Sequence, residues 1–256
     1  MKITTLITGA SNGIGLELAY INAKNGNNLI LVARNWTKLQ EIKAEIESAY
    51  DVMVTIISKD LSVNNAAQEV YNEVNLLNFK VDYLINNAGF GDYGLFAETQ
   101  WEKEQEMINL NITALTQLTK LFLPQMIKRR SGKILNLAST ASFQPGPKMA
   151  VYFATKSYVL HFSEAIANEV KEYGITVTAL CPGPTESGFQ SAAAMDNAKL
   201  FKDKKLPTSK EVATYGYDAM IKGKTVAIHG FMNAFLANSI RFIPRNLVVK
   251  IIRRLQ

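Results

Sequence analysis

The stretch TGASNGIG, residues 8–15, decides the fold. An apolar run of β-branched character, residues 3–8, comes before it, and a helical pattern, residues 14–25, follows it. A glycine-rich turn between a strand and a helix favours phosphate, because the first helical turn offers unpaired N–H groups and a positive dipole end. The glycines are spaced four and then two, unlike the usual dinucleotide fingerprint, so a turn without a ligand stays an alternative.

Apolar runs alternate with amphipathic stretches along most of the chain. The runs predict strands at residues 3–8, 29–33, 52–57, 83–85, 133–137, 176–180 and 225–228. Helical spacing predicts helices at residues 14–25, 39–49, 62–77 (capped by Ser62), 101–130 and 152–173. Strands separated by helices form right-handed crossovers and a parallel sheet. The sequence therefore predicts an α/β protein: a single doubly wound Rossmann-type domain, with about seven parallel strands, helices on both faces and ligand at the carboxyl ends of the strands.

Composition excludes several classes of protein. The 256 residues contain one cysteine, Cys181, and two histidines, His161 and His229, which lie far apart. We therefore expect no disulfide framework and no metal site. No apolar run reaches the roughly 18 residues needed to cross a bilayer, and the first ten residues resemble a buried strand more than a signal peptide. We expect a reduced, cytoplasmic protein.

Charge is concentrated at one end of the chain. The net charge is +6, yet residues 1–220 are nearly neutral, and residues 221–256 carry seven bases and no acid. We therefore expect no binding of nucleic acid. We predict a catalytic domain at 1–230, with a substrate lid at about 186–206, and a basic amphipathic helical extension at 231–256. The extension either packs on protein, which we favour, or lies on an anionic membrane surface.

Two residues after neighbouring strands bear on the cofactor. Arg34 follows the second predicted strand, where an acid would hold a ribose 2′-hydroxyl and an arginine accommodates a 2′-phosphate. Arg34 therefore favours NADP(H) over NAD(H), although a solvated loop arginine is the alternative. Asp60 follows the third strand and is placed to accept a hydrogen bond from an adenine amino group, or else to cap a helix.

A phenol and an ammonium share one face of a predicted helix. Tyr152 and Lys156 are four residues apart, and a neighbouring cation lowers the pKa of a phenol, so the pair suits proton transfer. The pair alone is common on helix surfaces. Ser139, after the fifth strand, adds a hydroxyl for a reacting carbonyl oxygen, and Asn111 lies in the long predicted helix.

Together these motifs resemble the short-chain dehydrogenase/reductase family. The matches, in the family's order, are TGAxxGxG at 8–15, Asp60, NNAG at 86–89, Asn111, Ser139, YxxxK at 152–156 and PGPT at 182–185. The resemblance implies that Tyr152 is the acid or base, that Lys156 lowers its pKa and holds the nicotinamide ribose, and that Ser139 orients the substrate oxygen. It also implies that Asn111 positions a relay water and that Asn87 supports the sheet edge.

The resemblance also implies a set of cofactor contacts. They are Gly9, Ser11, Asn12, Gly13, Ile14, Arg34, Asp60, Leu61, Asn87, Ala88, Gly89, Tyr152, Lys156, Pro182, Gly183 and Thr185. Many NADP-using members carry a base at the position of Asn12, so the preference for NADP(H) rests on Arg34, helped by Ser11.

We therefore expect an NADP(H)-dependent oxidoreductase that interconverts a ketone and a secondary alcohol, on an apolar or acyl-type small molecule. The alternative is a catalytically silent dinucleotide-binding sensor or scaffold. The resemblance also implies a homodimer or homotetramer. An apolar run, Ile108, Leu115, Leu118, Leu121 and Phe122, offers area for that contact.

Overall fold

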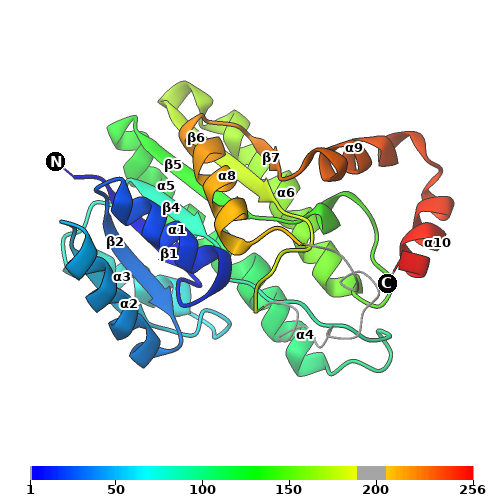
Figure 1. The fold of residues 1–256 in the computed structure, drawn as a ribbon, viewed down its shortest axis with the longest axis horizontal. Helices are drawn as coiled ribbons and strands as arrows, with labels where there is room; N and C mark the ends of the chain where they lie inside the picture. The colour runs from blue at the N-terminus through cyan, green and yellow to red at the C-terminus, as the bar shows by residue number, and fades with distance from the viewer. Residues whose placement is uncertain (1, 189–205, 256) are drawn as a thin grey trace.

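Seven parallel strands form one sheet in the computed structural model, which describes residues 2–188 and 206–255 (Figure 1). The strands are β1 (Thr4–Thr8), β2 (Asn28–Ala33), β3 (Val54–Ser58), β4 (Tyr83–Asn86), β5 (Gly132–Leu137), β6 (Ile175–Cys181) and β7 (Val226–Ile228). Their order is β3-β2-β1-β4-β5-β6-β7. All neighbours pair in parallel, which confirms the predicted fold class.

Helices cover both faces of the sheet. They are α1 (Gly13–Lys24), α2 (Trp36–Ala49), α3 (Ala66–Leu76), α4 (Trp101–Ile108), α5 (Leu115–Arg129), α6 (Ala150–Glu169), α8 (Ser209–Ile221), α9 (Phe231–Ser239) and α10 (Arg245–Leu255). Leu18 of α1, Ile42 of α2 and Val212 of α8 are buried in the core on one face. Val70 of α3 and Phe122 of α5 are buried in the core on the other. The nearly continuous apolar strands of the sequence are thus explained by burial on both sides.

Two predicted helices differ in detail. Helix α3 begins after Asn65, whose φ is 64°, three residues later than predicted. The hydroxyl of Ser62 donates to Asp60 and does not cap this helix. The long helix predicted at 101–130 contains a π-helical turn, Asn109–Ala114, between α4 and α5. Such a turn is uncommon and is often found at functional sites.

The apolar run proposed for subunit contact lies mostly inside the subunit. Leu115, Leu118 and Phe122 are buried in the chain's own cores, since they fall on the stripe of α5 that faces the sheet. That argument for a homodimer or homotetramer was wrong. The oligomeric state itself stays a prediction.

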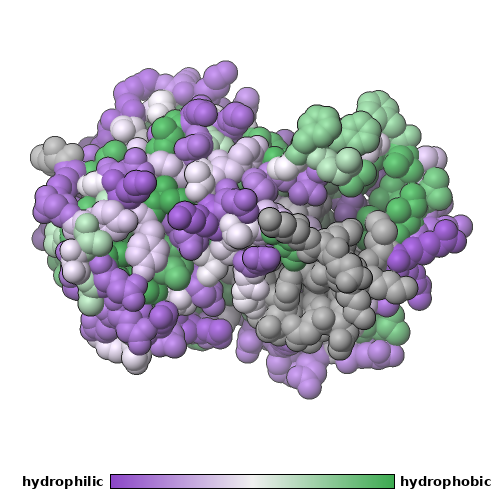
Figure 2. All heavy atoms as spheres, viewed as in Figure 1, coloured by the Kyte–Doolittle hydropathy of each residue, from purple (hydrophilic) through white to green (hydrophobic). Residues whose placement is uncertain are grey.

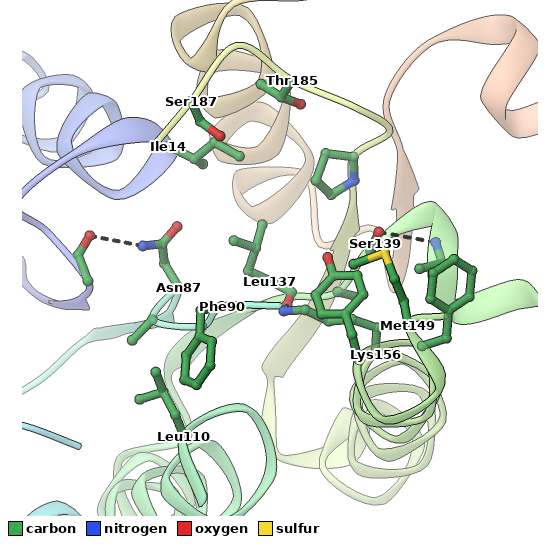
Figure 3. Close-up of a pocket in the computed structure, with 18 of the residues that line it drawn as sticks. Ile14, Asn87, Phe90, Leu110, Leu137, Ser139, Met149, Lys156, Thr185 and Ser187 are labelled. Carbon is green, nitrogen blue, oxygen red and sulfur yellow. Dashed lines mark hydrogen bonds between the residues drawn. The ribbon is translucent and has the colours of Figure 1, made fainter. Parts of the chain in front are cut away.

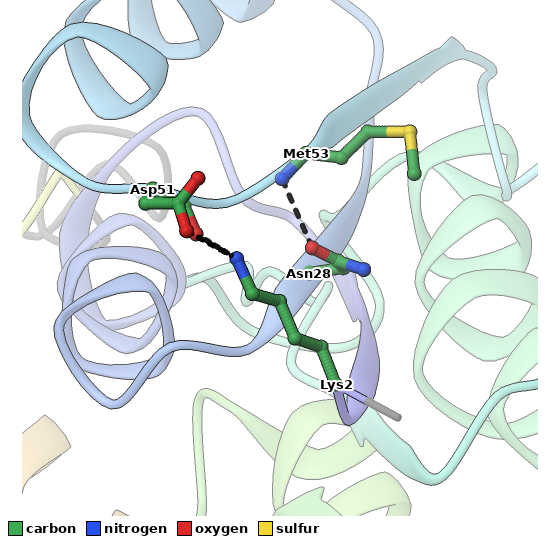
Figure 4. Close-up of polar contacts among 4 residues, drawn as sticks. All are labelled: Lys2, Asn28, Asp51 and Met53. Atoms are coloured by element: carbon green, nitrogen blue, oxygen red, sulfur yellow. Dashed lines mark hydrogen bonds and ion pairs between the residues drawn. The ribbon is translucent and has the colours of Figure 1, made fainter.

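Polar contacts tie the amino ends of the strands together, opposite the predicted ligand edge (Figure 4). Asn28 Oδ1 accepts a hydrogen bond from the backbone N–H of Met53 at 3.0 Å, which joins β2 to the chain entering β3. Lys2 Nζ forms an ion pair with Asp51 Oδ2 at 2.8 Å and also donates to the carbonyl oxygen of Asp51. This edge is exposed, so the ion pair adds little stability.

The C-terminal segment leaves the sheet after β7 and places α9 and α10 beside the carboxyl edge (Figure 1). Val248 of α10 is buried, and Ile252 contacts a cluster that contains Met107, Met149 and Tyr152. Part of the apolar stripe of α10 thus packs on the chain's own body, as we favoured. Among the described residues, no helix is long and apolar enough to cross a membrane.

Substitution of Val248 by serine tests this packing. Removing buried methyl groups and burying a hydroxyl costs about 2 kcal/mol, which lowers the melting temperature by roughly 4–8 °C in a chain of this size. Leu247→Ser is the matched control, because Leu247 is 49% exposed on the same helix. Equal melting temperatures for the two variants, measured by calorimetry, would contradict the packing.

Candidate active site

The glycine-rich turn requires glycine for two separate reasons. Gly9 and Gly13 have φ values of 66° and 54°, in the left-handed region that favours glycine. At Gly15 a Cβ atom would lie 2.3 Å from the carbonyl oxygen of Gly9, so helix α1 approaches the turn too closely for a side chain. The side chain of the N-cap residue, Asn12, bonds to no N–H of the first turn. This turn therefore fits an anion.

A polar clamp holds this turn against the end of β4. We use this name for the hydrogen bonds between Thr8 and Gly9 on one side and Asn87 and Ala88 on the other. Thr8 Oγ1 accepts from the backbone N–H groups of Asn87 and Ala88, both at 3.0 Å. Asn87 Nδ2 donates to the carbonyl oxygens of Thr8 at 2.9 Å and of Gly9 at 3.1 Å. The supporting role that the resemblance implied for Asn87 thus has a specific geometry.

Three of the four predicted catalytic side chains, Ser139, Tyr152 and Lys156, lie together where β5 ends and α6 begins. Tyr152 and Lys156 are 9% and 4% exposed, and Lys156 Nζ lies 5.8 Å from the centre of the Tyr152 ring. Lys156 Nζ donates to the carbonyl oxygen of Leu137 at 2.7 Å. Figure 3 shows Ser139 and Lys156 on one side of the cavity, opposite Ile14 and Asn87.

Ser139 is held in place by a reciprocal cap that the sequence analysis missed. Ser139 Oγ accepts from the N–H of Ala141 at 3.1 Å, and Ser142 Oγ accepts from the N–H of Ser139 at 3.3 Å. Ser142 Oγ also donates to the carbonyl oxygen of Lys156 at 2.7 Å. The pattern S-x-x-S after β5 was the available signal, since it resembles a capping box. Ser142 therefore connects the Ser139 loop to α6.

Asn111 lies behind the cavity and does not line it. Its amide group accepts from the N–H of Phe90 at 3.2 Å and donates to the carbonyl oxygen of Phe90 at 3.0 Å. It also donates to Thr155 Oγ1 at 3.1 Å. A Cβ atom at Gly89 would lie 2.8 Å from Asn111 Oδ1 and 3.4 Å from Lys156 Nζ. Asn111 thus joins the π-helical turn to the β4 loop and to α6, close to Lys156.

Burial governs the proton affinities of the pair. It raises the pKa of Tyr152 to about 12, although a hydrogen bond with Ser139 lowers that pKa. It lowers the pKa of Lys156 to about 8, with the Cys181 thiol acting in the opposite direction. The resemblance implies that Lys156 lowers the pKa of Tyr152, and that role stays a prediction. Burial, which disfavours the charged phenolate, is the largest influence on this pKa and raises it. At neutral pH the tyrosine is a protonated phenol, which is a proton donor.

Arg34 and Asp60 mark the other end of the cavity. Arg34 Nη1 lies 3.7 Å from Asp60 Oδ2, and the Arg34 side chain is 78% exposed. Asp60 Oδ1 accepts from the N–H of Ser62 at 2.9 Å and from its hydroxyl at 2.7 Å. Burial alone would raise the pKa of Asp60, but the Ser62 bonds and Arg34 hold it below its usual value. Most of the Arg34 guanidinium thus remains open to an incoming anion.

One cavity of about 1090 Å³ connects these groups. Every residue of the predicted cofactor set lines it, from Gly9 in the turn to Thr185 after β6. The volume exceeds the usual range for one drug-sized ligand, which leaves room for a dinucleotide and a substrate together. With the turn of α1 at one point and the Arg34 cation at another, the residues present fit a phosphorylated dinucleotide. Among the described residues no group of His, Cys, Asp and Glu could hold a metal ion.

The walls beyond the catalytic group are apolar, and they include residues that the sequence analysis did not place there. From the body of the chain they are Phe90, Leu110, Met149 and Phe153. From the C-terminal segment they are Leu236, Ala237, Ile240, Ile243, Val248, Ile251 and Ile252. The extension predicted at 231–256 is therefore part of the site. The only signal was its pair of apolar stripes, which did not indicate a partner.

Close packing fixes α9 against the PGPT segment. A Cβ atom at Gly183 would lie 2.6 Å from Asn233 Nδ2. The carbonyl oxygen of Pro182 accepts from the N–H of Thr140 at 2.9 Å, next to Ser139. Of the lid predicted at about 186–206, residues 189–205 lie outside the described residues, while Ser187 and Gly188 line the cavity.

Comparison with known proteins agrees with this geometry. A family model described as short chain dehydrogenase matches residues 3–198. The chain is similar to a very-long-chain 3-oxoacyl-CoA reductase from Homo sapiens, 28% identical over 96% of this chain and 77% of that protein. A reductase of the same name from Laccaria bicolor is 37% identical over 68% of this chain, and the match spans about half of that protein, 52%.

A solved structure resembles the whole fold. The short-chain dehydrogenase from Sphingobium yanoikuyae in complex with NADPH is 29% identical, with a TM-score of 0.84 over 94% of each chain. The matched residues carry the glycine turn, the polar clamp and the group of Ser139, Tyr152 and Lys156. The chain therefore belongs to the short-chain dehydrogenase/reductase family of NAD(P)-dependent oxidoreductases.

Proposed function

We propose that this chain uses NADPH to reduce an apolar ketone to a secondary alcohol, and that it can run the reverse oxidation. The observation that carries the proposal is the buried group of Ser139, Tyr152 and Lys156 in a cavity that extends to Arg34. A silent sensor or scaffold would need none of these side chains in this arrangement. The comparisons give that alternative no support.

Each side chain has a role in the proposed reaction. NADPH, when bound, would supply the hydride for the carbonyl carbon. Ser139 binds the carbonyl oxygen, where negative charge develops, and the Tyr152 hydroxyl gives its proton to that oxygen. A phenol with a pKa of about 12 is fully protonated at neutral pH, so it is ready to donate. Lys156, with a pKa of about 8, exchanges protons easily near neutral pH and is placed to restore the phenol.

The preference for NADPH over NADH rests on Arg34. Its exposed guanidinium lies at the end of β2, beside Asp60, at the end of the cavity opposite the catalytic group. A 2′-phosphate would gain a charge-assisted bond there. The similar dehydrogenase from Sphingobium yanoikuyae was solved with NADPH, which supports the same choice.

The apolar walls support the substrate class. Phe90, Met149 and Phe153 surround the catalytic group, and the C-terminal segment extends the apolar surface outward. A ketone with a long or bulky hydrocarbon part would bury that part against these walls, at roughly 25 cal/mol per Å². The names of the two similar reductases, which act on very-long-chain 3-oxoacyl-CoA, point to the same class.

Tyr152→Phe tests the proton donor. The variant keeps the ring and loses the transferable proton, so we expect turnover to fall by about 10²–10⁴-fold while NADPH binding is retained. Tyr158→Phe is the matched control, because Tyr158 is partly exposed on the same helix and outside the cavity. NADPH oxidation with a panel of ketones measures turnover, and near-normal turnover of the Tyr152 variant would remove it from this role.

Arg34→Asp tests the cofactor preference. Loss of a charge-assisted hydrogen bond weakens the binding free energy by about 1.5–3 kcal/mol. The affinity for NADPH should therefore fall roughly tenfold or more, whereas the affinity for NADH should be kept or improved. Lys38→Asp is the control, since Lys38 is a half-buried base on α2 outside the cavity. Fluorescence titration with both cofactors measures the affinities. Equal weakening of both would mean that Arg34 does not bind the 2′-phosphate.

Lys156→Met tests the buried ammonium through the pH dependence of stability. The pKa of Lys156 is about 8 when folded, against 10.5 when unfolded, so the unfolded chain binds the proton more tightly. The contribution of Lys156 to wild-type stability should therefore rise between pH 8 and pH 10.5. The methionine variant lacks this rise and should lose turnover. Its melting temperature relative to wild type should thus be highest below pH 8 and fall as the pH increases, whereas a constant difference would contradict the assignment.

A further inference from the structure

The outer face of the C-terminal segment exposes an unusual amount of apolar surface. We call it the C-terminal patch and define its apolar part as Phe231, Met232, Phe235, Leu236, Phe242, Leu247, Val249 and Ile251. Phe231 and Phe242 are 86% and 89% exposed. Figure 2 shows hydrophobic side chains gathered over α9, next to hydrophilic ones at the C-terminal helix. Exposed apolar patches of this kind mark contact surfaces in soluble proteins.

The same segment is strongly basic. Residues 231–256 contain five bases and no acid. The bases are Arg241, Arg245, Lys250, Arg253 and Arg254, all exposed. The ion pairs found among residues 2–188 and 206–255 include none of the five. Unlike Lys103, which is paired with Asp92 at 2.6 Å, these cations have no acidic partner within that part of the chain.

The patch borders the mouth of the cavity. Leu236 and Ile251 line the cavity and are also 53% and 39% exposed. The apolar wall of the cavity therefore continues, without a polar break at these two residues, onto the outer face of the segment. Whatever covers the patch lies directly beside the entrance of the site.

We propose that the C-terminal patch docks on an anionic lipid bilayer. Apolar side chains inserted at the level of the headgroups, with bases beside them, are the two features that hold an interfacial helix on such a surface. Helix α9 has 9 residues and α10 has 11, so each is about 14–17 Å long, which suits lying in the interface and not spanning it.

A second copy of the chain is the main rival occupant, and charge argues against it. A twofold contact through this patch would bring two sets of five cations together with no acid from either segment. Like charges held close in a contact oppose association. An anionic bilayer supplies the missing negative charge and apolar volume at once.

Docking also gives the cavity an orientation. With the patch on the bilayer, the entrance beside Leu236 and Ile251 faces the hydrocarbon region, so an apolar ketone dissolved in the membrane reaches the catalytic group without crossing water. This route rests on the proposed reaction. The docking itself does not.

Sedimentation with vesicles tests the docking without any substrate. The probes are vesicles of phosphatidylcholine alone and of phosphatidylcholine with phosphatidylglycerol. We expect the full chain to bind the anionic vesicles in a salt-sensitive manner and the neutral ones weakly. Arg253→Gln with Arg254→Gln should weaken binding roughly 25-fold, at about fivefold, or about 1 kcal/mol, per base. Phe231→Ser with Phe242→Ser should weaken it at least about tenfold.

Matched controls separate the patch from general surface effects. Leu76→Ser removes an apolar side chain that is 83% exposed on α3, and Lys222→Gln with Lys224→Gln removes two exposed bases outside the segment. Both controls should bind as wild type does. The variants change only exposed side chains outside the cavity, so their melting temperatures should equal that of wild type.

Three results would overturn the proposal. They are absence of binding to anionic vesicles, equal loss of binding in patch variants and controls, and self-association by light scattering that disappears in the phenylalanine variant.

A second experiment measures turnover. The phenylalanine variant should turn over a ketone carried in vesicles more slowly than wild type, and a water-soluble ketone equally fast. If the wild type turns over none of the ketones, the proposed reaction is wrong, and the result on vesicle binding is unaffected.

Discussion

The polar clamp between β1 and β4 is the constraint on which the site depends. Parallel strands end at one edge, but their loops are free to diverge unless something joins them. Thr8 and Asn87 join them with buried or part-buried hydrogen bonds at 2.9–3.1 Å, which also satisfy backbone groups that would otherwise be unpaired. With the clamp in place, helix α1 packs so closely that Gly15 has no room for a side chain. The anion-binding turn and the β4 loop are thereby fixed relative to each other.

The catalytic group is held from behind by a second polar network. Ser142 links the Ser139 loop to α6, and Asn111 links the π-helical turn to the β4 loop and to Thr155. These contacts keep Tyr152 and Lys156 buried, and that burial is what shifts their pKa values in opposite directions. A buried ammonium that, among the described residues, bonds to a backbone carbonyl and to no carboxylate is costly for stability. Its retention at this place is consistent with a functional role.

The C-terminal segment has two faces with separate tasks. Val248 and Ile252 face inward and line the cavity, and Ile252 also packs against the small core that contains Met149 and Tyr152. The aromatic side chains of α9 and the bases around α10 face outward. One short segment therefore couples the substrate wall to the molecular surface. A substitution on its inner face should alter substrate specificity. A substitution on its outer face should instead alter which surface the protein binds.

The sequence alone determined the seven strands and the parallel sheet, and the resemblance of its motifs to the family indicated which residues line the carboxyl edge. It could do so because apolar runs, helical spacing and glycine turns are local patterns, and strand ends at one edge converge whatever the rest of the chain does. The tertiary structure alone decided three further features. Asn111 lies behind the cavity because a π-helical turn places it there, and the stripe of Leu118 and Phe122 faces its own core.

The third feature is the apolar wall from α9 and α10. Ile252 packs against the cluster that contains Met107, Met149 and Tyr152, which lie a hundred residues or more earlier in the chain, and no local pattern encodes that packing. Periodicity shows that a helix has an apolar stripe but not which surface the stripe meets. The direction of the Tyr152 pKa shift was equally hidden, because it depends on how much water the folded chain excludes from the phenol.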